Sequence, residues 1–543
     1  MKMTRYYVLM LILCCGLVWL SYGGWFLFPA LWLTASIACV TFAYATNYPS
    51  LFRKSATGAI PHWVKVLFLP YLLATQLYNA FMRHNDSVPA IQEITPNLYL
   101  ACRLFPTDVE ALEAQGIKAI LDVTAEFDGL NWSAEQEHLF YLNLPVLDHY
   151  SPSEAQLLHA INWVKAQHQL GNKVVIHCAL GRGRSFFMLC AYLLATEPTL
   201  SERQVIEKVQ SIRSTARLNK KQLKRLLTLS KYIRDHQPPA ISLIINPVSG
   251  GGKWQQYANQ ILGLLSQKYS LNCHFTEKDT DVTELVKTIA PNEAHTFVAC
   301  GGDGTVAQVA AAIKNTQHTL AILPMGTANA LAHVMFGITS KVNPFNHACN
   351  ALLDYHTVQM DTLLCNDKTA LLVVALGIEE KMITHANRDQ KNQHGQLAYI
   401  QGFMDALLDS KPLNVQMQID NEETRQITSS SLAIANAAPI TTLLAQGGGT
   451  PDWQDGLFDI TQLEYQSDTS DKLLSLTELL NSSLSNQSNN INVKHHKGKT
   501  LEINATEPFH YCIDGEIEQA QKLNIEVLPK SLSIIAPATM ISG

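Results

Sequence analysis

The N-terminal stretch Tyr6–Phe52 contains no Asp, Glu, Lys or Arg over 47 residues. One bilayer crossing needs about 20 apolar residues. The length therefore predicts two membrane-spanning helices joined by a tight turn. Small and polar residues interrupt the run at 21–24, where we expect that turn.

Basic residues flank this run, with Lys2 and Arg5 before it and Arg53 and Lys54 after it. The positive-inside rule then places both ends in the cytoplasm. We expect a multi-pass protein of the cell membrane whose catalytic domains face the cytoplasm, where ATP is. The alternative is a cleavable signal peptide, but its apolar core spans only about 7 to 15 residues.

A third apolar stretch, 62–82, is interrupted by polar residues. Lys65, Gln76, Asn79 and Arg83 fall within about 60° of one another on a helix, which predicts an amphipathic helix lying in the membrane interface. A third crossing is the alternative, and it would place the rest of the chain outside. We expect an anchor over 1–55, then the interfacial helix and a linker over 56–87.

The remaining chain is long enough for several domains, because single cores stop growing at about 250 to 300 residues. A net charge of −6, with 47% hydrophobic and 16% charged residues, argues against a surface for polyanions. Nucleic acid is therefore not expected as a partner. The cysteines show neither a disulfide framework nor paired zinc spacing.

Residues 88–235 predict a compact α/β domain. Short apolar strands are expected at 97–101, 119–123 and 174–177, with helices at 107–114 and 185–194. Cys178 would follow the last strand and begin the loop HCALGRGRS, which leads into a helix. Such a loop aims backbone N–H groups inward and forms an anion cradle.

The residue types in this loop suit phosphate chemistry. A helix N-terminus and Arg184 favour the thiolate of Cys178, which is the nucleophilic form. The planar guanidinium of Arg184 can hold two phosphoryl oxygens at once, which a lysine cannot do as well.

This loop resembles the signature of dual-specificity cysteine phosphatases, in which His-Cys is followed by five residues and Arg-Ser or Arg-Thr. ITPNLYLA at 94–101 and LPVLDHYSPS at 144–153 extend the resemblance. It implies that Asp148 protonates the leaving oxygen and that Ser185 helps to expel the thiolate. A turn aspartate and a plain helix N-cap are the alternative roles of these two residues.

The phosphatase substrate stays open at this stage. Arg182 adds a second positive charge to the loop, which favours a polyanionic head group. Membrane attachment favours a membrane lipid over a phosphoprotein, and the loop sequence alone does not separate the two.

After a linker at 236–240, a new domain begins with the apolar strand ISLIIN and the loop NPVSGGGK. HTFVACGGDGT and LAILPMGTANALA repeat the pattern of a strand followed by a glycine-containing loop. Three such units predict a parallel sheet with a nucleotide at its carboxyl edge.

Together these motifs resemble the diacylglycerol kinase family, which includes sphingosine kinases and bacterial lipid kinases. The resemblance implies an ATP-binding domain over 241–355 and a mainly antiparallel β domain over 356–543. Ala330 and Gln308 stand where many relatives have acidic residues. Nucleotide-binding roles are implied for Asn246, Ser249, Gly250, Thr276, Gly301, Gly302, Asp303, Gly304, Thr305, Gly326, Thr327 and Asn329.

Two acidic clusters lie in the second kinase domain. By the resemblance, Asp455 binds a structural Mg²⁺ with main-chain oxygens near Asp452 and Leu457. Asp514, next to Glu516, matches the general base that deprotonates the lipid hydroxyl. An Asp-Gly pair is also a common hairpin turn, which is the alternative for Asp514.

The sequence thus predicts an α/β multidomain protein with two N-terminal transmembrane helices, a cysteine-phosphatase domain, and an α/β nucleotide-binding domain followed by a β-rich domain. The expected function is that of a membrane-anchored phosphatase and ATP-dependent lipid kinase in phospholipid metabolism. The alternative is a tethered dual-specificity protein phosphatase with a regulatory kinase-like half.

Overall fold

The computed structural model describes residues 2–55, 58–129, 139–236, 238–290, 293–337, 343–378, 406–439, 442–446, 449–485 and 492–540. Contacts divide the chain into two compact units. The first consists of Met1–Ala240 with Gln255–Cys273, and the second of Ile241–Trp254 with His274–Gly543. Each unit is described by itself below.

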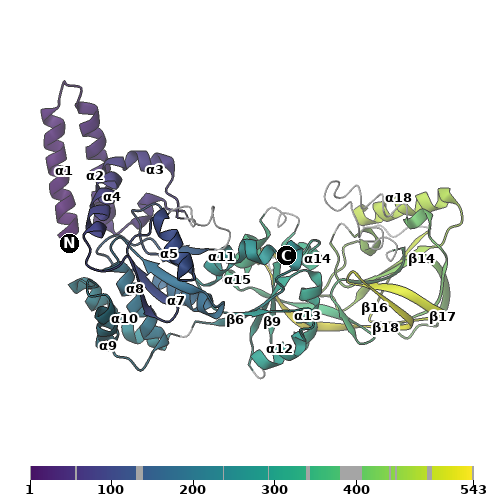
Figure 1. The fold of residues 1–543 in the computed structure, drawn as a ribbon. Coiled ribbons are helices and arrows are strands. Elements are labelled where there is room, and N and C mark those ends of the chain that lie inside the picture. The colour runs from purple at the N-terminus through teal and green to yellow at the C-terminus, as the bar shows by residue number, and fades with distance from the viewer. Residues whose placement is uncertain are drawn as a thin grey trace. The chain divides into compact units, whose positions relative to one another are not determined.

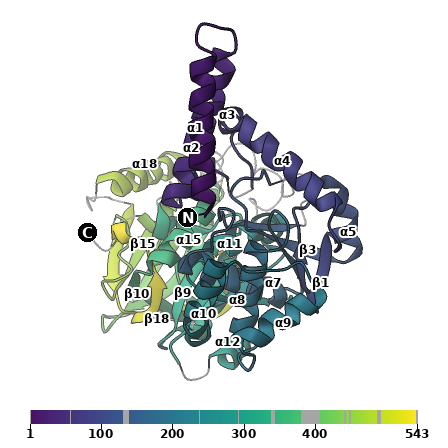
Figure 2. The same cartoon turned by 90° about the vertical axis from the view of Figure 1, so that its left-hand side faces the viewer.

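The first unit begins with a helical hairpin, α1 (Lys2–Leu20) and α2 (Leu27–Thr46), whose helices run side by side (Figures 1 and 2). The turn lies where the polar interruption predicted it. By length and composition alone, Met3–Leu20 and Leu27–Thr46 could each cross a membrane. The C-terminal half of α2 packs into a hydrophobic cluster with the helices that follow it.

The predicted helix at 62–82 is two helices, α3 (His62–Leu67) and α4 (Leu69–His84), because Pro70 starts a new helix. Lys65, Asn79 and Arg83 on its polar face point toward the protein, whereas Gln76 is exposed. Lys65 pairs with Asp128 at 2.5 Å, and the guanidinium of Arg83 pairs with Asp108 at 2.6 Å.

The phosphatase-like part of this unit is a five-stranded sheet in the order β1-β2-β5-β3-β4. The three strands predicted from apolar runs are confirmed as β2, β3 and β5. Only β1 runs antiparallel to its neighbour. The bounds are β1 (Ile91–Thr95), β2 (Leu98–Ala101), β3 (Ile117–Asp122), β4 (Phe140–Asn143) and β5 (Lys173–His177).

Helix α8 (Arg184–Thr196) follows β5 and is buried from Arg184 to Leu194, so its apolar side chains fill the centre of this part. Around it lie helices with polar outer faces, two of which begin with a Ser capping box. Their bounds are α5 (Val109–Ala114), α7 (Glu154–Gln169), α9 (Glu202–Ile212) and α10 (Lys220–Asp235).

The second unit begins with the parallel strands β6 (Ala240–Ile245), β8 (Thr296–Gly301) and β9 (Thr319–Pro324), in the spatial order β9-β8-β6. The prediction of parallel strand–loop units is confirmed. The helices that lie wholly in this unit are α12 (Val282–Ile289), α13 (Asp303–Ile313), α14 (Ala330–Phe336) and α15 (Pro344–Asp354). Most of α11 (Lys253–Leu265) and of β7 (Ser270–Phe275) belongs to the first unit.

The rest of the second unit is β-rich and antiparallel, as predicted, around an apolar core. Its last strand, β18, also pairs in parallel with β9, so one continuous sheet joins the two parts. The bounds are β10 (Thr357–Cys365), β11 (Lys368–Ala370), β12 (Val373–Gly377), β13 (Leu413–Ile419), β14 (Arg425–Ala435), β15 (Phe458–Glu464), α18 (Thr469–Ser485), β16 (Val493–Gly498), β17 (Thr500–Ile513) and β18 (Glu516–Ile535).

The ion pair between Lys54 and Asp122 is almost completely buried, with the ammonium 2.5 Å from the carboxylate. Lys54→Met leaves a buried carboxylate without its cation, so we expect a loss of about 3 to 5 kcal/mol in unfolding free energy. The measurement is the urea midpoint of the first unit by pulse proteolysis.

Lys65→Met is the matched control, because Lys65 also joins the N-terminal segment to an aspartate but is about one-third exposed. Its expected loss is below about 1 kcal/mol. Equal losses in the two variants would contradict the prediction.

Candidate active sites

The first candidate site is the loop between β5 and α8. It begins at Cys178, which is buried, and its sulfur accepts a hydrogen bond of 3.1 Å from the hydroxyl of Ser185. Ser185 lies in the first turn of α8, so its hydroxyl does not cap the helix but faces the sulfur. The predicted pairing of these two side chains is present in the structure.

The carbonyl groups of residues 179–182 in this loop accept hydrogen bonds from donors outside the loop. The oxygen of Ala179 accepts from the Arg103 N–H at 3.0 Å and from the amide of Asn79 at 2.6 Å. Buried Arg213 donates to the oxygens of Leu180 and Gly181. The Arg182 oxygen accepts from the N–H of Arg217 at 2.8 Å.

This outward fixing of the carbonyls has a consequence for the loop interior. Because each peptide group has its C=O and N–H on opposite sides, the N–H groups are left to face inward. Gly181 has φ +64, and a Cβ there would lie 2.7 Å from the carbonyl oxygen of Ala101. The loop therefore forms a tight anion cradle that requires glycine at this position.

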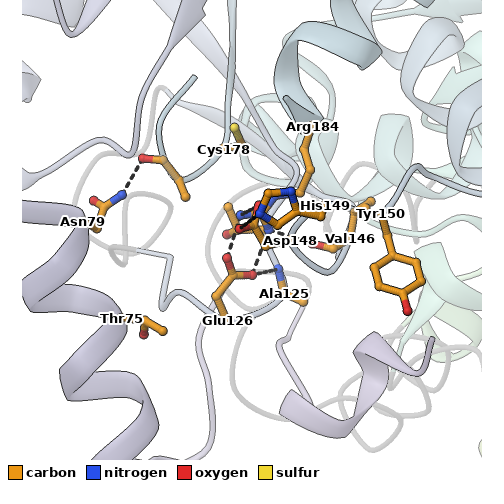
Figure 3. Close-up of polar contacts among 12 residues, drawn as sticks. Thr75, Asn79, Ala125, Glu126, Val146, Asp148, His149, Tyr150, Cys178 and Arg184 are labelled. Atoms are coloured by element: carbon orange, nitrogen blue, oxygen red, sulfur yellow. Dashed lines mark hydrogen bonds and ion pairs between the residues drawn. The ribbon is translucent and has the colours of Figure 1, made fainter. Parts of the chain in front are cut away.

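Arg184 lies at the base of the cradle and is held by Glu126 (Figure 3). Its two terminal nitrogens donate to the two Glu126 oxygens at 2.8 and 2.6 Å, and one of them also donates to the Val146 carbonyl. The Nε–H of Arg184 is buried and has no hydrogen-bond partner within the part of the chain that the structure describes. An oxyanion in the cradle would satisfy this donor.

Asp148 lies at the rim of the same site, with one carboxylate oxygen 3.4 Å from a terminal nitrogen of Arg184. Its side chain is 45% exposed, and His149 lies 3.5 Å from its other oxygen. The predicted acid is thus next to the predicted phosphate-binding arginine. Its role in proton transfer stays a prediction.

Two features of this site were not predicted from the sequence. Glu126 follows a buried strand like many loop glutamates, and no local pattern marks it as the partner of an arginine 58 residues away. Arg182 is paired with Asp86 at 3.1 Å, so its charge is not free for a polyanionic head group. The argument from Arg182 for such a head group is therefore not supported.

Behind the loop, a buried polar network supports His177. Asp122 accepts hydrogen bonds from Lys54, Thr124 and Tyr141 and lies 3.8 Å from Nε2 of His177. Burial alone would raise the pKa of Asp122, but the Lys54 ammonium and His177 hold that pKa well below its usual range. Burial lowers the pKa of His177, so its imidazole is neutral at neutral pH.

The second candidate site is formed by the glycine-containing loops after β6, β8 and β9. The loops touch backbone to backbone: a Cβ on Gly326 would lie 2.6 Å from the Cα of Gly302. A Cβ on Gly250 would lie 2.1 Å from the Met325 carbonyl oxygen, and Gly250 has φ +57. Larger residues would separate the loops, which explains the glycines at the carboxyl ends of these strands.

Polar side chains join the three loops. The hydroxyl of Ser249 accepts from the Gly302 N–H at 3.2 Å, and the amide of Asn246 lies 3.4 Å from the Thr305 hydroxyl. The side chain of Asn329 bonds both N–H and C=O of Gly326. Asp303 accepts from the N–H of Ala330 at 2.7 Å.

The other predicted nucleotide residues lie at the same sheet edge. Thr276 donates its backbone N–H to the Ile245 carbonyl at 2.8 Å, beside the end of β6. Thr327 is exposed on the loop after β9. Gly301 lies against Thr305, because a Cβ on Gly301 would overlap the Thr305 side chain. Gly304 lies in the first turn of α13.

Asp514 and Glu516 reach this edge from the turn between β17 and β18. An oxygen of Glu516 lies 3.8 Å from the position of a Cβ on Gly304. Asp514 accepts three backbone N–H groups, from Leu371, Leu372 and Val373, at 2.7 to 3.0 Å. The structure therefore brings the C-terminal acidic pair to the glycine loops.

Burial raises the pKa of Asp514 to about 6, the three N–H donors oppose that rise, and the nearby charge of Asp303 adds to it. Asp514 is in the left-handed region, with φ +47, so it is also the hairpin residue that the alternative prediction described. One carboxylate oxygen of Asp514 accepts only the N–H of Leu371 and keeps a lone pair for another hydrogen-bond donor.

The residues predicted to hold a structural Mg²⁺ do not form an open cation site. One Asp455 oxygen accepts from the N–H of Leu457, and the other is 2.8 Å from the ammonium of Lys497. Asp452 accepts from the N–H of Gln454. Within the described ranges no group of three His, Cys, Asp or Glu side chains could hold a metal. The Mg²⁺ at Asp455 therefore stays a prediction, and no catalytic step is built on it.

Two buried residues that the sequence did not single out support Asp514. Asp361 accepts the N–H groups of Gly456, in the loop before β15, and of Lys530, in β18, which fixes this loop and strand together. The amide of Asn436 donates to the carbonyls of Asp361 and Leu371, and Leu371 in turn donates to Asp514. This chain of hydrogen bonds positions the Asp514 carboxylate.

Three protein families match consecutive parts of the chain. The dual specificity phosphatase catalytic domain matches residues 98–231, and the diacylglycerol kinase catalytic domain matches 240–365. The YegS C-terminal NAD kinase beta sandwich-like domain matches 372–536. The first match contains Cys178 and Arg184, and the last contains Asp514.

Individual relatives match the kinase-like half. An uncharacterized protein of Synechocystis sp. is 38% identical over 307 residues, which is 54% of this chain and 70% of that protein. A probable lipid kinase, YegS-like, of Yersinia enterocolitica is 28% identical over 307 residues, 55% of this chain and 97% of its own length. The crystal structure of a diacylglycerol kinase from Bacillus anthracis has 17% identity and a TM-score of 0.43, covering 56% of this chain and 99% of that one.

Glu126 is expected to orient Arg184 for phosphate binding. Glu126→Ala removes two charge-assisted hydrogen bonds, so kcat/KM for an aryl phosphate should fall at least about tenfold. Glu126→Gln keeps one acceptor and should lose less. Glu207→Gln, an exposed carboxylate on α9 that pairs with Arg203, is the control and should stay near wild type. Full activity of Glu126→Ala would disprove this role.

Gly326 is expected to be essential for the nucleotide-binding edge, because its Cβ would force apart the loops after β8 and β9. Gly326→Ala should weaken ATP binding at least about tenfold by calorimetry, which corresponds to 1.4 kcal/mol. Gly263→Ala is the matched control, because a Cβ there meets nothing within 4 Å. Unchanged ATP affinity of Gly326→Ala would refute the proposed loop packing.

Proposed function

We propose that this chain is a membrane-anchored enzyme with two activities. Through residues 98–231 it belongs to the dual-specificity phosphatase family, and through residues 240–365 it belongs to the diacylglycerol kinase family. One half hydrolyses a phosphomonoester with a cysteine nucleophile. The other half transfers the γ-phosphoryl group of ATP to a lipid hydroxyl. The observation that carries the first activity is the buried Arg184 Nε–H at the base of the anion cradle, which has no partner among the residues that the structure describes.

In the phosphatase reaction, the Cys178 thiolate attacks phosphorus and the bond from phosphorus to the leaving oxygen breaks. Asp148 gives its proton to that oxygen. Loop N–H groups and Arg184 balance the charge on the equatorial oxygens. Water then cleaves the phosphocysteine, and the Ser185 hydroxyl, 3.1 Å from the sulfur, stabilises the departing thiolate.

In the kinase reaction, the three glycine loops hold the ATP phosphates with backbone N–H groups. Asp514 accepts the proton of the lipid hydroxyl as that oxygen attacks the γ-phosphorus, and ADP leaves. Asp303 and Glu516 would hold the Mg²⁺ that accompanies ATP, and this ion would supply positive charge at the phosphates. Support for this role of Asp514 comes from its position beside the loops and its raised pKa.

Membrane attachment supports a lipid as the common substrate class. The two helices of the hairpin have the length and composition of spans, and basic residues lie at their two free ends. Anchored in this way, both domains would face the cytoplasm, where ATP is available. The relatives named lipid kinases support a lipid acceptor for the second half.

The phosphatase proposal is tested with an aryl phosphate and the full chain in detergent. Cys178→Ser should abolish hydrolysis, and Asp148→Asn should lower kcat by about 10². Glu154→Gln is the control, because Glu154 is an exposed carboxylate in the first turn of α7 that pairs with Arg225. Hydrolysis that persists in Cys178→Ser rules out the proposed nucleophile.

The kinase proposal is tested with γ-labelled ATP and a total lipid extract. Asp514 must be deprotonated to act as a base, so label transfer should rise with pH through about 6 and level off above it. Asp514→Asn should reduce label transfer by a factor of about 10² or more and abolish its rise with pH. Glu518→Gln, a paired carboxylate on the same hairpin, should behave as wild type.

A different outcome of this experiment favours the alternative function. If wild-type protein binds ATP but labels no lipid, the kinase-like half is regulatory and the phosphatase is the sole activity. A phosphoprotein then becomes the expected phosphatase substrate.

A further inference from the structure

The segment that links the membrane hairpin to the phosphatase domain is part of the phosphatase site. Four polar side chains of residues 54–86 contact the loops that surround Cys178. Two contacts reach the end of β3 and the loop that follows it, and two reach the loop between β5 and α8, so the segment is not a passive spacer. The contacts are Lys54 to Asp122, Lys65 to Asp128, Asn79 to Ala179 and Asp86 to Arg182.

Asn79 makes the most direct of these contacts. It is 1% exposed, and its amide donates to the carbonyl of Ala179 at 2.6 Å (Figure 3). Ala179 is the first residue after the nucleophile. Because this bond turns a carbonyl outward, it helps to keep the neighbouring N–H groups directed at the phosphate.

The opposite face of the same helices is apolar and exposed. We call it the α3–α4 stripe. Its side chains are 46 to 66% exposed, and four of them repeat at every fourth residue along α4. Its members are Trp63, Val66, Leu69, Leu73, Leu77, Tyr78 and Phe81.

The α3–α4 stripe is continuous with the membrane hairpin. The indole N–H of Trp32, in α2, donates to the carbonyl of Val66 at 3.1 Å. Phe68, Tyr71 and Leu72, on the buried side of α3 and α4, share a hydrophobic cluster with the end of α2. Trp32 lies in the second turn of α2, far from the C-terminal end of that helix, so this contact places the Val66 end of the stripe beside the span, at the depth of the acyl chains.

We propose that the α3–α4 stripe is inserted in the bilayer beside α2 and that α4, through Asn79, holds the phosphate-binding loop in its active geometry. Asn79 is then a positioning residue, and membrane docking of α4 sets phosphatase activity. This inference rests on the proposed membrane anchoring and on the phosphatase activity, and goes beyond both because it couples them.

The docking part is tested by fluorescence with the full chain in phosphatidylcholine nanodiscs. The emission of Trp63 is obtained as the difference between wild type and Trp63→Phe. Brominated phosphatidylcholine should quench this difference signal. Leu73→Gln/Leu77→Gln should reduce the quenching, whereas Leu223→Gln/Leu227→Gln, two exposed leucines with the same spacing on α10, should not.

The coupling part is tested with an aryl phosphate, which needs no membrane itself. Asn79→Ala should lower kcat/KM about tenfold and weaken inhibition by inorganic phosphate, because the loop loses a buried hydrogen bond. Thr75→Ala, one turn earlier on α4 and bonded only within its helix, should change neither.

In nanodiscs, kcat/KM of the stripe variant Leu73→Gln/Leu77→Gln should be lower than that of wild type by a similar factor. Combining this variant with Asn79→Ala should cause little further loss of kcat/KM. Three results would overturn the inference: fully additive losses of kcat/KM, a Trp63 signal that is not quenched, or a reduction of quenching in the α10 control equal to that in the stripe variant. If wild type hydrolyses no aryl phosphate, the proposed function fails instead. The quenching experiment needs no turnover and still decides whether the stripe docks.

Discussion

The phosphatase half of this protein depends on the orientation of one run of peptide groups. Donors outside the loop hold the carbonyls of residues 179–182, and this leaves the N–H groups directed at the phosphate position. The donors come from helix α4, from the loop after β2 and from the chain after α9. An anion cradle built in this way is preorganised, because no peptide group has to turn when the phosphate binds.

A comparable constraint shapes the kinase half. Gly302 and Gly326 leave no room for a Cβ between the loops after β8 and β9, so two strand ends meet backbone to backbone. The turn that carries Asp514 reaches the same edge because β18 pairs with both β17 and β9. The β-rich part therefore supplies the acidic groups, and the parallel strands supply the phosphate-binding loops.

Much of this architecture follows from local sequence patterns. The strand before Cys178, the helix after it and the three glycine loops lie within short segments whose periodicity and turn residues are readable directly. The exception among the helices is 62–82, where amphipathicity was correct but Lys65 and Arg83, on the polar face, pack on protein rather than face water. Periodicity separates the two faces of a helix but does not identify what each face contacts.

The sequence by itself identified the candidate residues for the chemistry: Cys178 and Arg184 in one loop, and the glycines with Asp303 and Asp514 in the other half. Only the tertiary structure decided which groups hold them. Glu126 reaches Arg184 across 58 residues, and Asn79 reaches Ala179 across 100. Such partners leave no local signal, because a buried hydrogen bond depends on where the fold brings two segments together and not on their spacing in the chain.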